Sequence, residues 1–424
     1  MDTQITNLIL AEEKRQLEGL ELIPSENYVS RAVLDAVGSV LTNKYSEGYP
    51  GRRYYGGQAN TDKIETIAIE RAKQLFGADH ANVQPHSGAT ANEAVYHSWL
   101  EPGDTIMAMD LSHGGHLTHG APVTVLAKQY NFIRYKMKNV ETGEIDFDEL
   151  RSFAQKYKPK IILAGYSAYP RELDYAKFAE IGNEVGAVLV ADIAHIAGLI
   201  AGKVLKNPFD YGFHVMSTTT HKTLRGPRGG MILSRGIVGN PLKVPEKTVE
   251  NLPTLIDRVV FPGLQGGPMM HVIAGKAVSF HEALDPEFKE YTKQVVVNAK
   301  KLSEDLMAQG CKLITNGTDN HLMLVDVVSS FGIDGAEAET LLDNVGLTLN
   351  KNSIPDDINS PFRPSGIRLG TPAITTRGAV EGDMSLLAGW IVDAILHRTD
   401  AKHLERIKHE VTDFALSLKS PTEL

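Results

Sequence analysis

The chain has 424 residues, of which 42% are hydrophobic and 22% are charged, a composition that is typical of a globular protein and excludes a disordered or fibrous one. At about 150 residues a domain, this length indicates two or three domains. The net charge of −9 disfavours nucleic acid or an anionic membrane as a partner, because positive surfaces bind both. The composition therefore favours a small-molecule substrate.

Residues 1–11 lack the basic start and long apolar run of a secretion signal, and no stretch reaches the roughly 18 apolar residues of a membrane span. We therefore expect a cytoplasmic protein. Cys311 is the only cysteine, which excludes an intrachain disulfide and a multi-cysteine metal site. The chemistry has to come from other residue types.

From about residue 60 the sequence alternates helix-like and strand-like patterns. Apolar residues recur at helical spacing between Ile64 and Phe76, and helical patterns return at 147–157 and 175–185. Short apolar runs, typical of buried strands, lie at 105–109, 161–164, 188–191, 214–218 and 231–233. This alternation predicts an α/β domain with a mainly parallel sheet.

From about Pro286 the pattern changes to charged helices, then to shorter strand candidates at 323–327 and 347–350, and finally to a helical tail. This change predicts a smaller α+β domain. We therefore expect three parts, which are an N-terminal arm or helical segment (1–50), a large α/β domain (51–280) and a small C-terminal domain (281–424).

Polar residues follow two of the predicted strands, where open α/β sheets bind their ligands. The run at 188–191 ends in Asp192, with His195 soon after, and the run at 214–218 leads to Lys222. A buried lysine can lose its proton and attack a carbonyl, while a carboxylate can keep a pyridine nitrogen protonated. Together the two residues indicate a pyridoxal site.

Each of these signals is weak alone, because a lone lysine is mostly exposed and an aspartate after a strand is often a helix cap. A third element strengthens the interpretation. The segment Ser87-Gly88-Ala89-Thr90-Ala91-Asn92 has small residues that could open a helix whose free amides bind a phosphate. A phosphate cradle, an acid and an amine in this order are hard to obtain by chance.

The segment at 217–230, Ser-Thr-Thr-Thr-His-Lys-Thr-Leu-Arg-Gly-Pro-Arg-Gly-Gly, resembles the cofactor-lysine segment of serine hydroxymethyltransferases. Further segments similar to this family lie in family order at 22–27, 45–57, 84–88, 113–119, 261–268, 349–352 and 365–373. The resemblance implies a fold like that of aspartate aminotransferase, a fold-type-I enzyme of pyridoxal phosphate. Its large domain has a mainly parallel seven-stranded sheet, and a smaller α+β domain follows at the C-terminus.

The resemblance also implies an activity, the reversible conversion of serine and tetrahydrofolate to glycine and 5,10-methylenetetrahydrofolate. Pyridoxal 5'-phosphate would be bound covalently to Lys222, and tetrahydrofolate would be the co-substrate. Asp192 would pair with the pyridinium nitrogen, His195 would flank the phenolic oxygen, and His116 would stack on the ring. The phosphate would be held by Ser87, Gly88 and Ala89, and by Gly267 across a dimer.

For the substrate, the resemblance implies that Arg368 binds the amino acid's carboxylate, with Ser25 on its other side. Glu47 would manage a proton, with Tyr45 and Tyr55 supplied by the neighbouring subunit, Tyr45 also beside the cofactor. Thr219 and His221 would tune the cofactor site, as would Arg228, whose charge should lower the affinity of Lys222 for protons. Residues near the folate, one of them also near the cofactor, would be Leu111, Gly115, Leu117, Ser167 and Asn352.

Three alternatives stay open at this point. A folate-independent aldolase of 3-hydroxy amino acids could use the same fold, and a methanopterin-like compound could replace folate, because Tyr28 and residues 58–60 depart from the family pattern. The chain could also be a catalytically idle binding protein. The shared site implies at least a homodimer, with a tetramer not excluded.

His113, His116 and His119 recur beside Asp110 and could be taken for a metal cluster. Gly114 and Gly115 lie between them and disfavour a regular helix that would align the imidazoles. We therefore expect no metal.

Overall fold

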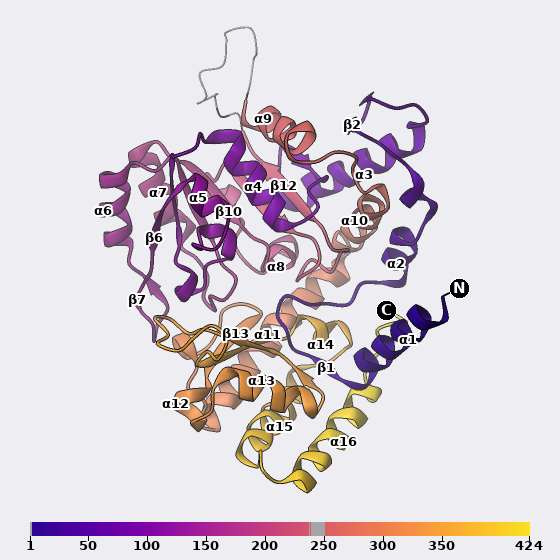
Figure 1. Ribbon diagram of the computed structural model, residues 1–424, viewed down its shortest axis with the longest axis vertical. Coiled ribbons are helices and arrows are strands. Elements are labelled where there is room, and N and C mark those ends of the chain that lie inside the picture. Colours follow the sequence, from indigo (N-terminus) through magenta and orange to yellow (C-terminus); the bar gives the residue numbers. More distant parts are fainter. Residues whose placement is uncertain (1, 237, 239–250) are drawn as a thin grey trace.

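The structure is a computed structural model of the chain, and it describes residues 2–236, 238 and 251–424 (Figure 1). A large body around a sheet occupies the upper part of the view, and a smaller body of orange and yellow elements lies below it. No helix in the described ranges is long and apolar enough to cross a membrane. The cytoplasmic location stays a prediction.

The large body is built on a seven-stranded sheet. Its strand order is β4 (His80–Asn82), β12 (Gly230–Ser234), β11 (Val215–Thr219), β10 (Val188–Asp192), β9 (Ile161–Gly165), β5 (Thr105–Met109) and β6 (Asn131–Tyr135). Only β12 is antiparallel to its neighbours, β11 and β4, while the other pairs are parallel. The mainly parallel seven-stranded sheet is therefore confirmed.

The central strands read as continuous apolar runs because both faces of the sheet are covered. On β9, Ile161 and Leu163 contribute to one hydrophobic core and Ile162 to the other, as the alternation of side chains along a strand requires. Helices that cover the two faces include α3 (Ala59–Phe76), α4 (Gly88–Trp99), α6 (Phe147–Tyr157), α7 (Tyr175–Val185), α9 (Leu252–Arg258) and α10 (Met270–Ala283).

The smaller body has its own hydrophobic core and a three-stranded antiparallel sheet of β13 (Leu322–Asp326), β16 (Gly366–Gly370) and β15 (Asn350–Asn352). Its helices are α11 (Pro286–Ala308), α12 (Val327–Phe331), α13 (Gly335–Asn344), α14 (Pro372–Thr376), α15 (Met384–Leu396) and α16 (Ala401–Ser417). The expected strand at 323–327 ends one residue early, because Asp326 caps α12. The expected strand at 347–350 is split between β14 (Leu347–Thr348) and β15.

The N-terminal segment packs against this smaller body. After α1 (Thr3–Glu18), the short strand β1 (Leu20–Glu21) pairs in parallel with β14. The boundaries expected at residues 50 and 280 stay predictions. The structure adds that residues near the start of the chain share a core with its last 130 or so residues.

Arg377 joins the two ends of the chain, which lie near each other in Figure 1. It is among the largest fully buried side chains, with 1% exposure. Its guanidinium donates to the carbonyls of Gln16, Leu17 and Gly19 at the end of α1, and to those of Ala415 and Lys419 at the end of α16. The last carbonyls of a helix lack partners inside it, so one buried cation satisfies both helix ends.

Arg377→Met should lower the free energy of unfolding by about 3 kcal/mol, because these buried carbonyls lose a charged donor. Urea denaturation followed by circular dichroism measures the change. Arg31→Met is the control, since Arg31 pairs with Asp35 on the surface and its loss should cost under about 1 kcal/mol. Equal effects of the two substitutions would contradict this account of Arg377.

Candidate active site

The candidate site lies where β10 and β11 end. The two strands are parallel neighbours, with Asp192 opposite Ser217 in the register, so the segments that follow them leave the sheet at the same edge. The lysine that follows β11 by three residues is therefore brought to the edge where the aspartate of β10 lies. The acid and the amine therefore come from two adjacent strands.

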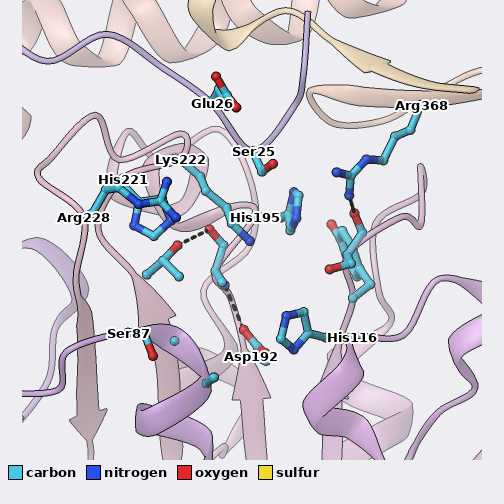
Figure 2. Close-up of a pocket in the computed structure, with 16 residues that line it drawn as sticks. Ser25, Glu26, Ser87, His116, Asp192, His195, His221, Lys222, Arg228 and Arg368 are labelled. Carbon is cyan, nitrogen blue, oxygen red and sulfur yellow. Dashed lines mark hydrogen bonds between the residues drawn. The ribbon is translucent and has the colours of Figure 1, made fainter. Parts of the chain in front are cut away.

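A cavity of about 450 Å³ opens at this edge (Figure 2). Most of the predicted cofactor residues line it, together with Arg368 from β16 of the smaller body. The lining residues are Ser25, Glu26, Ser87, Gly88, Ala89, His116, Tyr166, Ser167, Asp192, Ala194, His195, Thr219, His221, Lys222, Arg228 and Arg368. Of these, Glu26, Tyr166 and Ala194 did not follow from the sequence patterns.

Asp192 is a buried carboxylate held by three donors. One oxygen accepts from Asn92 Nδ2 at 2.8 Å and contacts His119 Nε2 at 3.0 Å, and the other accepts from the Ala194 amide at 3.1 Å. Burial alone would raise the pKa of Asp192, but the hydrogen bond to His119 and the neighbouring donors hold it well below its usual range. The side chain is therefore a permanent anion.

Lys222 lies 8% exposed and extends toward the middle of the group of side chains in Figure 2. Among the described residues, none accepts a hydrogen bond from its ammonium. Burial lowers the pKa of Lys222 to about 8, since the attraction of Asp192 is countered by Arg368 and Arg228. Arg228 thus acts in the expected direction, and the amine is partly neutral near physiological pH.

Ser87 is the N-cap residue of α4, and the N-terminus of this helix lines the cavity. Its hydroxyl accepts from the Thr90 amide at 3.2 Å, as an N-cap residue does. A Cβ added to Gly88 would lie 2.7 Å from Thr219 Cγ2, so only glycine leaves room there for β11 to pass. The small residues leave the first amides of the helix accessible to an anion.

Arg368 is anchored on two sides. Its Nε donates to Asn350 Oδ1 at 3.1 Å and one terminal nitrogen donates to the Ser167 carbonyl at 2.8 Å. Burial lowers the pKa of Arg368 to about 10, which still leaves it charged. The other terminal nitrogen has no partner among the described residues, so it is available to a carboxylate in the cavity.

Buried or half-buried imidazoles line the cavity in their neutral form. Burial lowers the pKa of His116 to about 4 and that of His221 to about 3, and it lowers the pKa of His195 well below its usual value. His321, which the sequence patterns did not single out, stacks on His195 with ring centroids 5.5 Å apart. The only sequence signal for it was a histidine directly before the apolar strand β13.

A second set of predicted residues lies away from this cavity. We call Tyr45, Glu47, Tyr55 and Gly267 the Glu47 cluster. The rings of Tyr45 and Tyr55 are 5.2 Å apart, and both side chains are about half exposed. A Cβ added to Gly267 would lie 3.1 Å from the Tyr45 ring, and one added to the neighbouring Gly266 would lie 3.4 Å from the Glu47 carboxylate. None of the four lines the cavity of its own chain.

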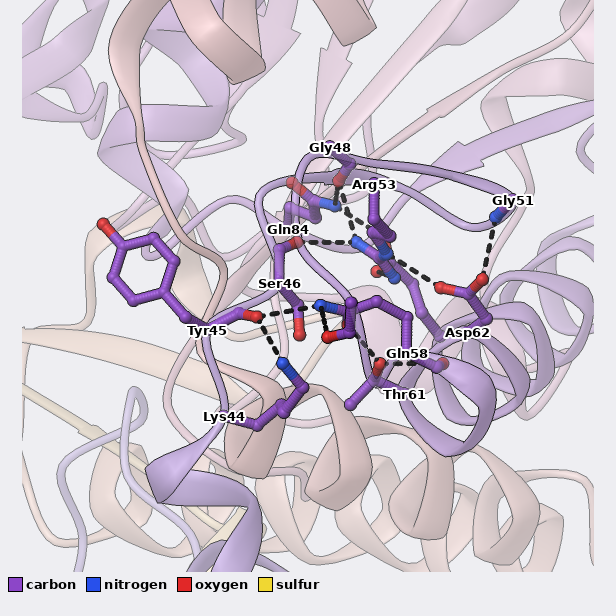
Figure 3. A network of polar contacts seen from close by, with 12 residues as sticks. Lys44, Tyr45, Ser46, Gly48, Gly51, Arg53, Gln58, Thr61, Asp62 and Gln84 are labelled. Atoms are coloured by element: carbon purple, nitrogen blue, oxygen red, sulfur yellow. Dashed lines mark hydrogen bonds and ion pairs between the residues drawn. The ribbon is translucent and has the colours of Figure 1, made fainter.

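The loop that carries the Glu47 cluster is fixed by a buried polar network (Figure 3). Arg53 donates to the Ser46 and Gly48 carbonyls at 2.9 and 2.8 Å and pairs with Asp62 and Glu65. Gln84 then donates to Gly48 and Glu65. Because Gln84 lies three residues before Ser87, this network connects the loop to the helix start at the cavity.

Most of the residues expected near folate do not line the cavity. Leu111 and Leu117 are 46% and 49% exposed, in short 3-10 turns that follow β5. Ser167 lines the cavity, whereas Leu111, Gly115, Leu117 and Asn352 do not. Their role as pterin contacts stays a prediction.

The three histidines of the 113–119 segment do not point at one place. His113 contacts Asp356 in the smaller body at 3.1 Å. Donor atoms of His116, His119 and Asp192 do lie within 4.8 Å of one another. Those of His119 are already engaged, Nδ1 by the His116 amide and Nε2 by Asp192.

The donor set fits pyridoxal 5'-phosphate. A buried amine without a partner suits covalent capture of an aldehyde, a permanently anionic carboxylate suits a pyridinium nitrogen, and an open helix N-terminus suits a phosphate. The buried amine, which has no hydrogen-bond partner among the described residues, would be costly to bury without a ligand. The cavity therefore matches this cofactor on its own chemistry.

Comparison with known proteins leads to the same family as the sequence motifs. The family model described as serine hydroxymethyltransferase matches residues 1–391. A serine hydroxymethyltransferase of Koribacter versatilis is 52% identical over 410 residues, which cover 97% of this chain and 92% of the relative. One of Acidobacterium capsulatum is 52% identical over 414 residues, which cover 98% and 93%. The chain belongs to the serine hydroxymethyltransferase family.

Proposed function

We propose that the protein is a serine hydroxymethyltransferase that uses pyridoxal 5'-phosphate and tetrahydrofolate to interconvert serine and glycine. The observation that carries the proposal is that two complementary groups lie at one edge of the sheet. One is the buried amine of Lys222, which has no hydrogen-bond partner among the described residues, and the other is the anionic carboxylate of Asp192. Membership of the family supports it, since both named relatives are serine hydroxymethyltransferases.

In this proposal the cofactor supplies an electron sink for the bonds at the amino acid's Cα. Ser87, Gly88 and Ala89 hold its phosphate at the start of α4, and Asp192 keeps its ring nitrogen protonated. His116 and His195 also line the cavity, where His116 would contact the cofactor's ring and His195 its phenolic oxygen. Lys222 would hold the cofactor's aldehyde carbon through its amine.

Arg368 binds the substrate's carboxylate and Ser25 lies on the other side of that group. A charged contact from Arg368 would fix the orientation of the substrate's carboxylate and limit rotation at its Cα. Neutral His221 and Thr219 lie beside the lysine, where they can hold or pass a proton. Two of these groups, Thr219 and Lys222, are under 10% exposed, which limits the access of water to them.

We further propose that two copies of the chain complete each site. Tyr45 and Tyr55 are about half exposed, and no member of the Glu47 cluster lines the cavity of its own chain, which suits residues that serve a neighbouring subunit. Glu47 would then manage the proton of the serine hydroxyl or of the pterin, with Tyr45 and Tyr55 beside it. A dimer with exchanged loops is the smallest assembly that meets this requirement.

The first test uses the visible spectrum of the protein loaded with pyridoxal phosphate. Glycine should produce a strong long-wavelength band only when tetrahydrofolate is also present, because the pterin couples to proton loss at glycine. Lys222→Ala should lose the covalent absorption band of the loaded enzyme. Cleavage of threonine-like substrates at a rate that folate does not change would instead support an aldolase.

The second test concerns the pKa of Lys222, which lies near 8. Only the neutral amine attacks an aldehyde. The rate of covalent capture of the cofactor by the apoenzyme should therefore rise about tenfold per pH unit from pH 6 to 8 and level off above pH 8. Stopped-flow absorbance measures this rate. A profile that keeps rising to pH 10 would show an unperturbed lysine and contradict the assignment.

The third test is subunit complementation. Lys222→Ala and Glu47→Gln should each be nearly inactive, but their heterodimer has one site with neither change if the Glu47 cluster serves the partner. A mixture unfolded and refolded in equal amounts should recover roughly a quarter of wild-type activity. Recovery of none would place Glu47 in the same site as Lys222 of its own chain.

A further inference from the structure

Lys276 is a buried lysine outside the cavity. It lies on α10 and is 1% exposed. Its ammonium donates to the carbonyls of Val83 at 2.7 Å, Gly230 at 2.7 Å and Pro85 at 3.3 Å. Three N–H groups thus meet three acceptors, so the ammonium is fully satisfied by the backbone.

These acceptors belong to the segment that leads into the phosphate-binding turn and to the start of β12 beside that turn. Val83 and Pro85 lie between β4 and α4, the latter two residues before Ser87. Gly230 begins β12, its amide donates to the Pro85 carbonyl at 2.9 Å, and a Cβ added to it would lie 2.2 Å from the Ser87 carbonyl oxygen. Lys276 therefore joins the backbone of both segments directly behind the helix start.

Gln265 supports the same segment from a neighbouring position. Its Nε2 donates to the Gln84 carbonyl at 3.0 Å, and its Oε1 accepts from the His86 amide at 3.0 Å. Residues 83–86 are therefore held by side chains that come from residues 265 and 276, nearly 200 positions along the chain. The Gln84 side chain faces the other way, into the network of Figure 3.

The charge of Lys276 reaches the cavity as well. Burial lowers the pKa of Lys276 to about 7, against the attraction of Glu65, and three carbonyl acceptors favour its charged form. After burial, its charge is a further cause of the lowered pKa values of His86 and His221. A phosphate dianion at Ser87 would in turn favour the ammonium.

We propose that Lys276 is a positioning residue that sets the geometry of the phosphate-binding turn at Ser87 and adds a positive charge behind it. The inference rests on the proposed function, in which this turn binds the cofactor's phosphate. The hydrogen bonds of Lys276 go to the segments beside the phosphate-binding turn and to neither Lys222 nor Asp192.

Lys276→Met tests this proposal, since methionine keeps most of the volume and removes the ammonium. The apoenzyme is titrated with pyridoxal 5'-phosphate and, separately, with pyridoxal, which lacks the phosphate. The substitution should raise the Kd for pyridoxal phosphate about tenfold or more, while the Kd for pyridoxal changes less than about threefold. A role in overall folding would weaken both to the same extent.

Gly229→Ala gives a second route that keeps the lysine. The added Cβ would lie 2.6 Å from Lys276 Cε and 2.9 Å from Nζ, so it should displace the ammonium from its carbonyls. This variant should show the same selective loss. Arg71→Met is the matched control, because Arg71 donates to the Ala277 carbonyl of the same helix without contacting residues 83–86, and its Kd ratio should equal that of wild type.

A Kd ratio that stays at the wild-type value in both Lys276→Met and Gly229→Ala would overturn the proposal. If the wild-type apoenzyme still binds pyridoxal phosphate more tightly than pyridoxal, the phosphate site stands, and only the role of Lys276 is refuted. Wild-type apoenzyme that binds neither compound would refute the proposed function, and the inference with it.

Discussion

Burial of the Asp192 charge is the constraint on which the rest of the site depends. A carboxylate at 8% exposure is stable only when donors satisfy it. Here the donors come from α4 through Asn92, from the turn after β5 through His119, and from the backbone after β10. Three elements of the large body are thereby held around one atom group, and the cavity for the cofactor is the space that they leave.

Close backbone packing is the second requirement, and glycines meet it. A Cβ added to Gly165, at the end of β9, would lie 2.7 Å from the Cβ of Asp192. One added to Gly88 or Gly230 would strike β11 or the Ser87 turn. At this edge the strands and the helix start approach more closely than any side chain allows, which places backbone amides where an anion can reach them.

Several buried cations are stabilised in the same way, by hydrogen bonds to backbone carbonyls. Lys276 and Arg377 donate almost entirely to backbone carbonyls, and Arg53 combines carbonyls with the carboxylates of Asp62 and Glu65. A carbonyl cannot move far or change charge, so each cation ties two chain segments rigidly. Arg53 holds the loop that carries Glu47, and Lys276 holds the segment that leads to Ser87.

The sequence by itself determined five strands of the large sheet, all but β4 and β6, and helices such as α3, α6 and α7, because buried strands and amphipathic helices differ in apolar period. It also determined the residues of the cavity that follow strand ends or begin a helix, such as Asp192, Lys222 and Ser87. Motif resemblance added Arg368 and the Glu47 cluster, which no local pattern would have joined to them.

Only the tertiary structure decided which distant residues support the site. Examples are His321, which stacks on His195, and Lys276 and Gln265, which hold the segment before Ser87. More than 100 positions separate each of them from its partner, and the hydrophobic period of a sequence does not predict such contacts. The structure also decided that the Glu47 cluster lies outside its own cavity. The physical reason is that burial and hydrogen-bond partners arise from packing of whole elements, whereas local sequence sets only the conformation of each element.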